Sequence, residues 1–568
     1  MKFRTTHQVI ATAISFAFLI SSCVSGQIGK DSSKEFKKGM VASAHPIATK
    51  VGIDILKSGG NAVDAAVAVQ FALAVVYPNA GNLGGGGFLV YRSASGEVAT
   101  LDFREKAPAL ASRNMYLDSS GNAITEKSLY GQLAAGVPGS VDGMLEAHDK
   151  YGKLSWAKVV QPAIDLAQNG YALTDNQVSE LNSNRNDFMK YNPGKDYYIK
   201  SDVWKSGDKV QQADLGHTLV LIRDKRRAGF YEGEVAGYIE AEMKAGGGVM
   251  TANDLKNYKS IWRQPIKGKY KEYTIITMPP PSSGGIALMQ LLKSVEPYPL
   301  KRWGFNSDST VQLMVEAERR VYADRATHLG DPDFYNVPQP ALLEGSYSVK
   351  RMADINWSKA TESAEIKAGR VNGRESEETT HFSIVDREGN AVSVTTTLNG
   401  SYGSKVFVKG AGFLLNNEMD DFSVKPGTPN MYGLVGGEAN AIAPGKRMLS
   451  SMTPTILEKN GDLFMVVGTP GGSTIITSVF QTILNVIEFD KNMQAAVNAK
   501  KFHHQWLPDE VFVEKGALDS ITKTSLERKG YRISERGPIG RVDAILKTKW
   551  GYYQGGADPR GDDTFMGW

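Results

Sequence analysis

The chain has 568 residues, of which 41% are hydrophobic and 22% are charged, a composition ordinary for a soluble globular protein. The net charge of +4 is small for this length, and no block of like charge resembles a nucleic-acid-binding arm, so we expect no nucleic-acid partner. With 8 histidines and 1 cysteine, the sequence argues against a metal site and excludes an intramolecular disulfide.

The N-terminus has the pattern of a targeting segment. Basic residues precede the apolar stretch 9–20, which is too short to span a bilayer comfortably. The residues up to Cys23 then resemble a bacterial lipobox, so we expect 1–23 to be a signal peptide with Cys23 as the lipidation candidate. Ordinary cleavage near Gly26 is the alternative. Either way we expect export to the bacterial periplasm, with membrane attachment only through a lipidated Cys23.

Helical and extended patterns alternate along the rest of the chain. Apolar spacing and glycine or proline stops predict helices at 45–57, 65–76, 161–168, 235–244, 311–329 and 475–489. Short apolar runs predict strands at 88–91, 273–277 and 463–467. Ser309 has the position of an N-cap for the helix at 311–329. The pattern indicates a mixed protein in which buried helices cover a sheet core.

A β-hairpin with its turn centred on Glu388 follows a polar, turn-prone segment, 358–378, that predicts a loop. The predicted strands are 381–385 and 391–397. If the hairpin is symmetric about its turn, Thr379 faces Thr397, with the opposed Cβ atoms about 4.5–5.5 Å apart. A slip of one residue would pair Thr380 with Thr397 instead.

Thr379 has the position that an N-terminal nucleophile needs. A threonine hydroxyl is a poor nucleophile unless a base takes its proton, and an α-amine with a pKa of about 7.7–8.0 is well placed to do so. Cleavage between Glu378 and Thr379 would put nucleophile and base on one residue, and Thr397 could orient the hydroxyl. The alternative is that both are ordinary strand threonines.

Two segments rich in glycine stand beside predicted strands. The first, 81–87, lacks the Lys-Ser/Thr of a phosphate loop, so we expect a tight crossing of the backbone there. The second, 468–473, joins a predicted strand to a predicted helix. The amides of Gly471 and Gly472 could therefore point at a developing anion, although an ordinary strand-to-helix turn is the alternative.

Three groups of polar residues indicate a pocket for an amino-acid head. Arg104 could hold a carboxylate bidentately, and Ser450 and Ser451 offer it hydroxyls. The run 416–422 gathers three carboxylates that could hold an ammonium group. Singly, each group is better explained as part of a solvated loop. Together they predict a zwitterion pocket that is cationic at one end and anionic at the other.

Ten segments, in chain order, resemble the γ-glutamyltransferase (γ-glutamyl transpeptidase) family of N-terminal-nucleophile hydrolases. They are AHPIATKVGI (44–53), NLGGGGF (82–88), DFRE (102–105), PPPSSGG (279–285), YADR (322–325), TTH (379–381), NNEMDDF (416–422), SSMTPT (450–455), TPGGS (469–473) and FHHQWLPD (502–509). The likeness covers nearly the whole of the chain after the targeting segment.

The resemblance implies an α+β protein, a four-layer αββα sandwich shared by a heavy chain, 24–378, and a light chain, 379–568. It implies that the two chains are cut from one precursor between Glu378 and Thr379 and stay together as a heterodimer. The implied catalytic residues are Thr379 as nucleophile, Thr397 as its supporting hydroxyl, and Gly471 and Gly472 as the oxyanion hole. The implied substrate-binding residues are Arg104, Ser450 and Ser451 for the α-carboxylate, Asn399, Glu418 and Asp421 for the α-ammonium, and Tyr432 in a lid at 426–437.

The implied reaction needs no cofactor and no metal. A γ-glutamyl group passes from glutathione or a related compound, through an ester on Thr379, to water or to an amino acid or dipeptide. A glutaryl-type β-lactam acylase, with the same fold and nucleophile, is the nearest alternative. Its substrate lacks the α-ammonium group, so Glu418 and Asp421 favour the γ-glutamyl compound. A non-enzymatic exported binding lipoprotein, which would not be cleaved, is the third possibility.

Overall fold

The computed structural model of the protein describes residues 34–194, 197–366 and 379–568. The predicted signal peptide 1–23, the lipidation candidate Cys23, and the end of the predicted loop with Glu378 lie outside the described residues. The residues that are described belong to one compact unit, Ser33–Trp568.

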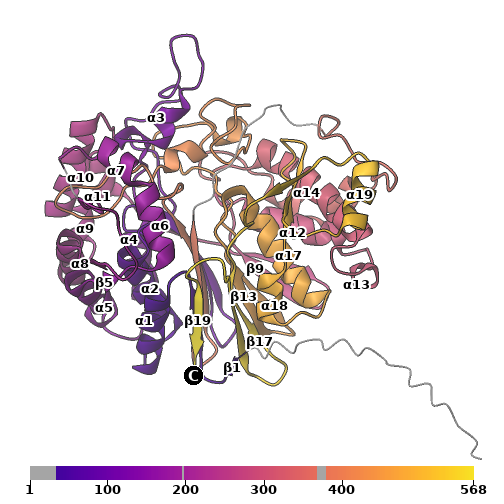
Figure 1. Cartoon of the computed structure of the whole chain (residues 1–568), viewed down its shortest axis with the longest axis horizontal. Coiled ribbons are helices and arrows are strands. Elements are labelled where there is room, and N and C mark those ends of the chain that lie inside the picture. Colours follow the sequence, from indigo (N-terminus) through magenta and orange to yellow (C-terminus); the bar gives the residue numbers. More distant parts are fainter. Residues whose placement is uncertain (1–33, 195–196, 367–378) are drawn as a thin grey trace, which may run out of the picture. The chain divides into compact units, whose positions relative to one another are not determined.

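Two seven-stranded antiparallel sheets form the middle of this unit (Figure 1). In spatial order the first contains β1 (Glu35–Phe36), β18 (Tyr553–Ala557), β17 (Asp543–Lys547), β13 (Asp462–Gly468), β12 (Thr455–Lys459), β9 (Tyr273–Thr277) and β8 (Ile266–Tyr270). The second contains β19 (Thr564–Gly567), β2 (Met40–Ser43), β10 (Thr380–Val385), β11 (Ala391–Thr397), β3 (Gly86–Arg92), β4 (Val98–Asp102) and β7 (Ile261–Arg263). The strands predicted at 88–91, 273–277 and 463–467 are confirmed as β3, β9 and β13.

The two sheets pack against each other, and each strand divides its side chains between two cores. In β3, Val90 points into the core between the sheets, whereas Leu89 and Tyr91 point into the core beneath the helices. In β13, Val466 faces the other sheet and Met465 faces helices. This alternation follows from the two-residue period of a strand, and it explains why both faces of these strands are apolar.

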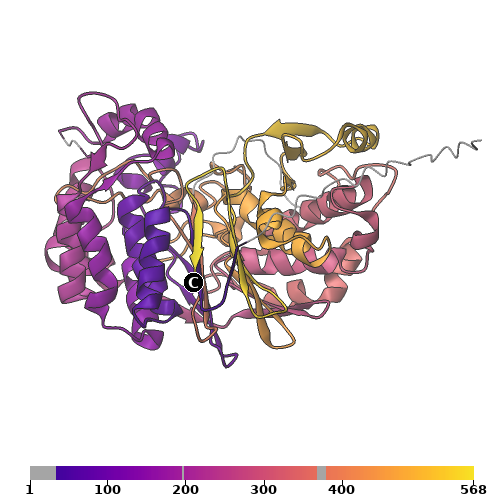
Figure 2. The ribbon, with the colours of Figure 1, turned by 60° about the horizontal axis from the view of Figure 1, so that its bottom comes forward.

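Helices cover the outer face of each sheet, so the unit has four layers (Figure 1, Figure 2). On the second sheet lie α1 (Pro46–Lys57), α2 (Ala62–Val76) and α4 (Ser140–Tyr151), with α5 (Trp156–Asn169) packed on α2 and α8 (Ala213–Lys225) packed on α5. On the first lie α12 (Gly284–Val295), α14 (Asp308–His328), α17 (Ile475–Ile487) and α18 (Met493–Asn498). The predicted α+β fold, an αββα sandwich, is confirmed.

Several helix boundaries differ from the prediction. The helix expected at 311–329 begins at Asp308, and its N-cap is Ser307, whose hydroxyl accepts from the Thr310 amide at 3.4 Å; Ser309 lies inside the helix. The helix expected at 161–168 is only the second half of α5. The helix begins earlier, at Trp156, and continues through Pro162, a residue that usually interrupts a helix. The helix expected at 65–76 begins earlier, at Ala62, behind a capping box made by Asn61 and Asp64.

Each sheet combines strands from before residue 366 with strands from after residue 379. β10 pairs with β2, and β11 pairs with β3, so the predicted hairpin lies between two strands from the first part of the chain. In the first sheet, β12 pairs with β9 across the same division. Both sheets therefore depend on both parts of the chain.

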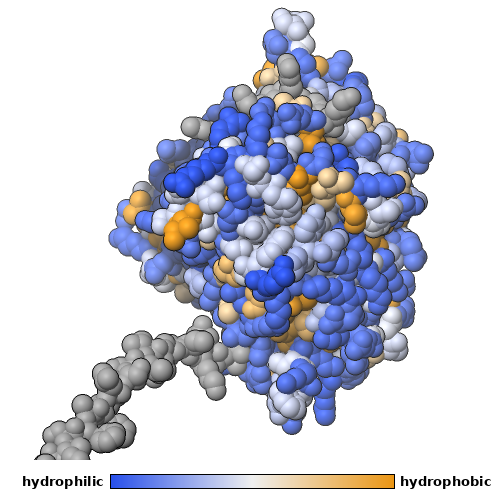
Figure 3. Space-filling model, turned by 90° about the vertical axis from the view of Figure 1, so that its right-hand side faces the viewer, coloured by the Kyte–Doolittle hydropathy of each residue, from blue (hydrophilic) through white to orange (hydrophobic). Residues whose placement is uncertain are grey.

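Shorter elements complete the described chain: α3 (Thr125–Leu129), β5 (Tyr171–Ala172), α6 (Asp175–Ser183), α7 (Arg185–Tyr191), β6 (Lys209–Val210), α9 (Ala228–Tyr231), α10 (Gly233–Gly246), α11 (Ala252–Asn257), α13 (Leu300–Trp303), α15 (Gln339–Leu343), α16 (Gly345–Arg351), β14 (Phe502–His503), β15 (Val511–Glu514), α19 (Ser520–Arg528) and β16 (Ile533–Arg536). The face drawn in Figure 3 is largely hydrophilic, with small apolar spots scattered over it. Among the described residues, no helix has the length and apolar character needed to cross a membrane.

Candidate active site

The β10–β11 hairpin has the predicted register. Thr380 lies opposite Thr396, and Val385 lies opposite Ala391. Continued by one residue, this register brings Thr379 to Thr397, and their Oγ1 atoms are 3.5 Å apart. Both side chains are buried, and the Thr397 hydroxyl also accepts from the Asn399 amide at 2.7 Å. Thr397 is therefore held in place beside Thr379.

The glycine segment at 81–87 is a tight backbone crossing, as predicted, and it supports Thr397. A Cβ at Gly85 would lie 2.0 Å from the Thr397 carbonyl oxygen, and one at Gly84 would lie 2.2 Å from the Leu414 oxygen. Asn82 donates to the Thr397 carbonyl at 3.0 Å. Close approach of backbone to backbone explains the glycines, so this segment has a packing role.

The segment at 468–473 joins the end of β13 to α17 through a short 3₁₀ turn, Gly472–Thr474. Gly471 and Gly472 have φ values of 135° and 50°, which favour glycine. A Cβ at Gly472 would lie 2.3 Å from Cδ1 of Tyr432. The Tyr322 hydroxyl donates to the Ser473 carbonyl and fixes the turn from below. The two glycines thus lie at the N-terminus of a helix, where backbone amides can stabilise an anion.

Arg104 lies among carboxylates. Its guanidinium donates to Glu418, to Asp421 at 2.5 Å, and to Glu105 at 3.5 Å. It also donates to the Leu449 carbonyl at 3.2 Å. The sequence predicted a cationic end and an anionic end, but the opposite charges are in direct contact. Adjacent opposite charges suit the head of an α-amino acid, whose carboxylate and ammonium groups are bonded to one carbon.

The charges in this cluster do not balance. Arg104 is the cation in contact with the carboxylates of Glu105, Glu418 and Asp421, and all four groups are buried or nearly so. With Arg325, a second buried cation that acts on Asp421, two cations stand against three carboxyl groups. Burial raises the pKa of Glu418 and of Asp421, and Arg104 offsets this only in part. A further positive charge placed here would be stabilised, and perturbed carboxyl groups of this kind are typical of functional sites.

One of the two predicted serines, Ser451, has a basic partner that was not predicted from the sequence. Arg325, buried in α14, donates to the Ser451 hydroxyl at 3.0 Å and to the Ser283 hydroxyl at 2.9 Å. The Ser450 hydroxyl accepts from the Met452 amide at 3.1 Å. Two features of the sequence could have indicated Arg325: it belongs to the YADR segment, and it lies among many charged residues in a helix that is buried over most of its length.

Tyr432 closes the site from the predicted lid. Its side chain is 4% exposed, and its hydroxyl donates to the Asn399 carbonyl at 2.6 Å. Asp420 and Asp421 attach the lid from the side of Arg104, because Asp420 accepts from the Met431 amide at 2.9 Å and Asp421 accepts from the Asn430 amide group at 2.9 Å. Burial raises the pKa of Asp420 to about 6.

The predicted catalytic and substrate-binding residues, with the exception of Gly471, line one small cavity of about 20 Å³. It is lined by Arg104, Thr379, Thr397, Asn399, Glu418, Asp421, Tyr432, Leu434, Ser450, Ser451, Met452, Gly472 and Ile475. The structure therefore brings together the predicted site residues from segments up to about 370 positions apart in the sequence. No cluster of metal-ligating side chains occurs within the described ranges.

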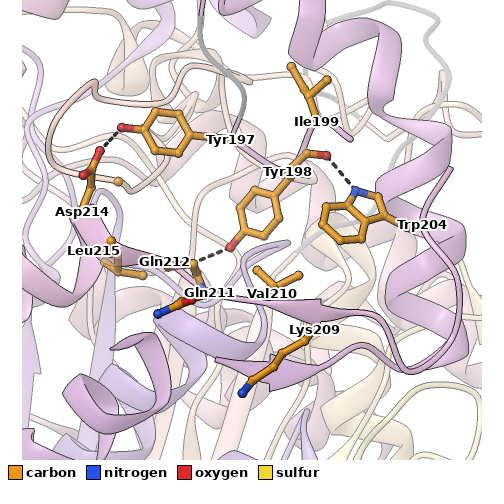
Figure 4. A pocket seen from close by; sticks show the side chains of 12 residues that line it. Tyr197, Tyr198, Ile199, Trp204, Lys209, Val210, Gln211, Gln212, Asp214 and Leu215 are labelled. Carbon is orange, nitrogen blue, oxygen red and sulfur yellow. Dashed lines mark hydrogen bonds between the residues drawn. The ribbon is translucent and has the colours of Figure 1, made fainter. Parts of the chain in front are cut away.

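A larger cavity, of about 400 Å³, lies elsewhere and contains none of the predicted site residues (Figure 4). Its wall includes three aromatic residues, and several of its polar groups bond to one another. The Tyr198 hydroxyl donates to the Gln212 side chain at 2.6 Å, and the Trp204 ring N–H donates to the Tyr198 carbonyl at 2.8 Å. Chemistry-bearing groups are concentrated in the smaller cavity around Thr379.

Comparison with known proteins identifies the family of the chain. The model of the gamma-glutamyltranspeptidase family matches residues 48–568. The chain belongs to this family. The glutathione hydrolase proenzyme of Escherichia coli (strain K12) is 47% identical over 535 residues, which are 94% of this chain and 92% of the relative.

Two solved structures extend the comparison. A chain of Helicobacter pylori gamma-glutamyltranspeptidase is 45% identical with a TM-score of 0.57, and it covers 58% of this chain and 94% of its own length. The cephalosporin acylase from Bacillus halodurans is 26% identical with a TM-score of 0.84, over 99% of both chains. The fold is thus shared by gamma-glutamyltranspeptidases and acylases, and the site must distinguish them.

Proposed function

We propose that this member of the gamma-glutamyltranspeptidase family is an autocatalytically processed γ-glutamyltransferase and glutathione hydrolase. The observation that carries the proposal is the position of Thr379, whose hydroxyl lies beside that of Thr397 at the mouth of a carboxylate-rich cluster around Arg104. Relatives named glutathione hydrolase proenzyme, matched over nearly their whole length, support it.

Processing would cut the bond between Glu378 and Thr379. It would give a heavy chain, 24–378, and a light chain, 379–568, and it would free the Thr379 α-amine, whose ordinary pKa of about 7.7–8.0 suits a base at neutral pH. Because both sheets contain strands from each part, the products would stay together as a heterodimer.

The processed enzyme would act by two-step acyl transfer. The Thr379 α-amine takes the proton of the Thr379 hydroxyl, whose oxygen attacks the γ-amide carbon of the donor. The amides of Gly471 and Gly472 stabilise the tetrahedral oxyanion. The carbon–nitrogen bond breaks, the leaving amine takes the proton, and a γ-glutamyl ester remains. Water, or the amine of an amino acid or dipeptide, then attacks the ester and restores the Thr379 hydroxyl.

The substrate head would lie in the cluster around Arg104. Arg104, Ser450 and Ser451, which line one cavity, would hold the α-carboxylate, and Arg325 would support Ser451 through its hydrogen bond. The excess of carboxylates over cations favours an α-ammonium beside Glu418 and Asp421, and Asn399 lines the same wall. Tyr432 would cover the bound head.

The competing function is that of a glutaryl-type β-lactam acylase, favoured by the whole-chain likeness to the Bacillus halodurans acylase. γ-Glutamyl-anilide and glutaryl-anilide form a matched pair, since they differ only in the α-ammonium group. A hydrogen bond to a charged group contributes about 1.5–3 kcal/mol, so kcat/KM for γ-glutamyl-anilide should be about 10- to 100-fold higher. The variant Glu418→Gln, which lacks the negative charge beside the α-ammonium, should reduce the ratio of kcat/KM for γ-glutamyl-anilide to that for glutaryl-anilide. A preference for glutaryl-anilide would assign the protein to the acylases.

We also infer that the protein is exported and anchored in the bacterial periplasm through Cys23. The support is the sequence pattern that ends at Cys23, which lies outside the described residues. In fractionated cells the wild-type protein should sediment with membranes, and Cys23→Ser should move it to the soluble fraction. Soluble wild-type protein whose first residue lies after Cys23 would favour ordinary secretion.

A further inference from the structure

The segment FHHQWLPD, at 502–509, belongs to the family pattern, yet the proposed chemistry assigns no role to it. It begins as strand β14 and continues to a hydrogen bond with the main chain of the lid. Gln505, at its centre, is buried and lies outside the residues that line the small cavity. It nevertheless contacts the lid directly.

The orientation of the Gln505 amide is fixed by its partners. The side-chain nitrogen lies 3.1 Å from the Tyr432 carbonyl oxygen and 3.2 Å from the Leu507 carbonyl oxygen. Carbonyl oxygens only accept, so the NH₂ group must face both of them. The Gln505 side-chain oxygen then faces Nε2 of His503 at 2.9 Å.

This orientation also fixes the tautomer of His503. Because the Gln505 oxygen only accepts, His503 Nε2 must carry the proton and donate. In the neutral ring, Nδ1 is then an acceptor for the Thr477 hydroxyl, which lies 2.8 Å away in the first turn of α17 and also lies 3.1 Å from the Thr474 carbonyl oxygen. A directional chain of hydrogen bonds thus runs from α17, behind the glycine turn, through His503 and Gln505 to the backbone of the lid.

Gln505 is one of several partners that hold Tyr432, whose amide also donates to the Asn430 side chain at 3.0 Å. The Tyr432 ring lies against Gly472, and its hydroxyl donates to the Asn399 carbonyl. Both of these contacts are made within the site, where a donor must enter. The contact from Gln505 to the Tyr432 carbonyl is made from outside the site, on the main chain, so it does not compete with a substrate for the side chain.

We propose that Gln505 is a positioning residue that holds the lid, residues 426–437, closed over the substrate head by binding the main chain at Tyr432. The proposal rests on the proposed γ-glutamyl transfer as far as its kinetic consequence is concerned. Loss of the contact should weaken retention of the donor without removing any group that touches the reacting atoms. The change should therefore appear in KM and in the mobility of the lid.

Two variants separate this role from a general structural one. Gln505→Glu keeps an acceptor for His503 but offers no amide donor to Tyr432. Gln505→Met is neutral, of similar length, and loses both contacts. Thr477→Val is the matched control, since it removes the hydrogen bond on the other side of His503 and leaves Gln505 against the lid.

The experiment measures hydrogen–deuterium exchange of the lid peptide and steady-state kinetics with γ-glutamyl-anilide. Both Gln505 variants should exchange about tenfold faster at 426–437, the effect of one lost hydrogen bond, and should raise KM about 5- to 10-fold with kcat within about twofold. Thr477→Val should leave lid exchange and KM near the wild-type values.

Wild-type exchange in both Gln505 variants would overturn the proposal, and so would equal changes in Thr477→Val and Gln505→Glu. If Gln505→Met fails to fold, the comparison of Gln505→Glu with the wild-type protein and with Thr477→Val still tests the proposal. Wild-type protein that cleaves no γ-glutamyl donor would refute the proposed function, whereas the exchange measurement would still test the lid contact.

Discussion

Thr379→Ala should yield a single uncut chain without γ-glutamyl transfer activity. The variant lacks the hydroxyl that both the self-cleavage and the acyl transfer require, and without cleavage the α-amine stays locked in a peptide bond. The side chain is buried against Thr397, so loss of the hydroxyl should disturb packing little. Activity should fall by at least about 10⁴-fold, the scale seen when a catalytic nucleophile is removed.

Gel electrophoresis and N-terminal sequencing check this result. The wild-type protein should give two bands, the smaller one beginning with Thr379. Thr380→Ala is the matched control, because Thr380 is the adjacent threonine and its buried hydroxyl has no partner within the described residues; it should be cleaved and active. Cleavage of Thr379→Ala at the same bond would refute self-processing by Thr379. An uncut, inactive wild-type protein would revive the hypothesis of an exported binding protein.

Gly472→Val should lower kcat by about 10²–10³, the effect of losing one oxyanion donor. The Cβ would lie 2.3 Å from the Tyr432 ring, and φ is 50°, which β-branched residues disfavour. Either the lid or the glycine turn must move. In both cases the Gly472 amide would lose its alignment with the developing oxyanion.

The measurement compares turnover of γ-glutamyl-anilide by purified, processed protein. Gly461→Val is the control, since Gly461 also has a positive φ, of 86°, but a Cβ there meets nothing within 4 Å. This control should retain wild-type kcat and lose only stability. If Gly472→Val turns over as fast as Gly461→Val, the glycine turn does not form the oxyanion hole.

The local geometry around Thr379 could be predicted from the sequence because it depends on short-range rules. The turn at Glu388 and the two-residue period of the strands fix the register, and hence the approach of Thr379 to Thr397. The glycine crossing at 81–87 was similarly predictable, because it lacks the residues of a phosphate loop.

Contacts between distant segments could not be derived in this way. The ion pairs of Arg104 with Glu418 and Asp421 join positions more than 300 residues apart, so the sequence suggested two charged ends where the structure has one mixed cluster. Arg325 and Gln505 were missed for the same reason, since each acts on a partner from another segment. Both Ser307 and Ser309 satisfy the local pattern of an N-cap, so the sequence alone could not identify Ser307 as the residue that caps the helix.

The shared sheets have a consequence for the lifetime of the enzyme. A chain that folds whole brings β2, β10, β11 and β3 together as parts of one molecule, with the high effective concentration that a covalent tether provides. Scission removes that tether for good. Once denatured, the two fragments would have to meet by diffusion with exposed strand edges, so aggregation would compete with reassembly. The cleaved form would then persist because it unfolds slowly, that is, through kinetic stability. Only the uncleaved form would refold efficiently after denaturation.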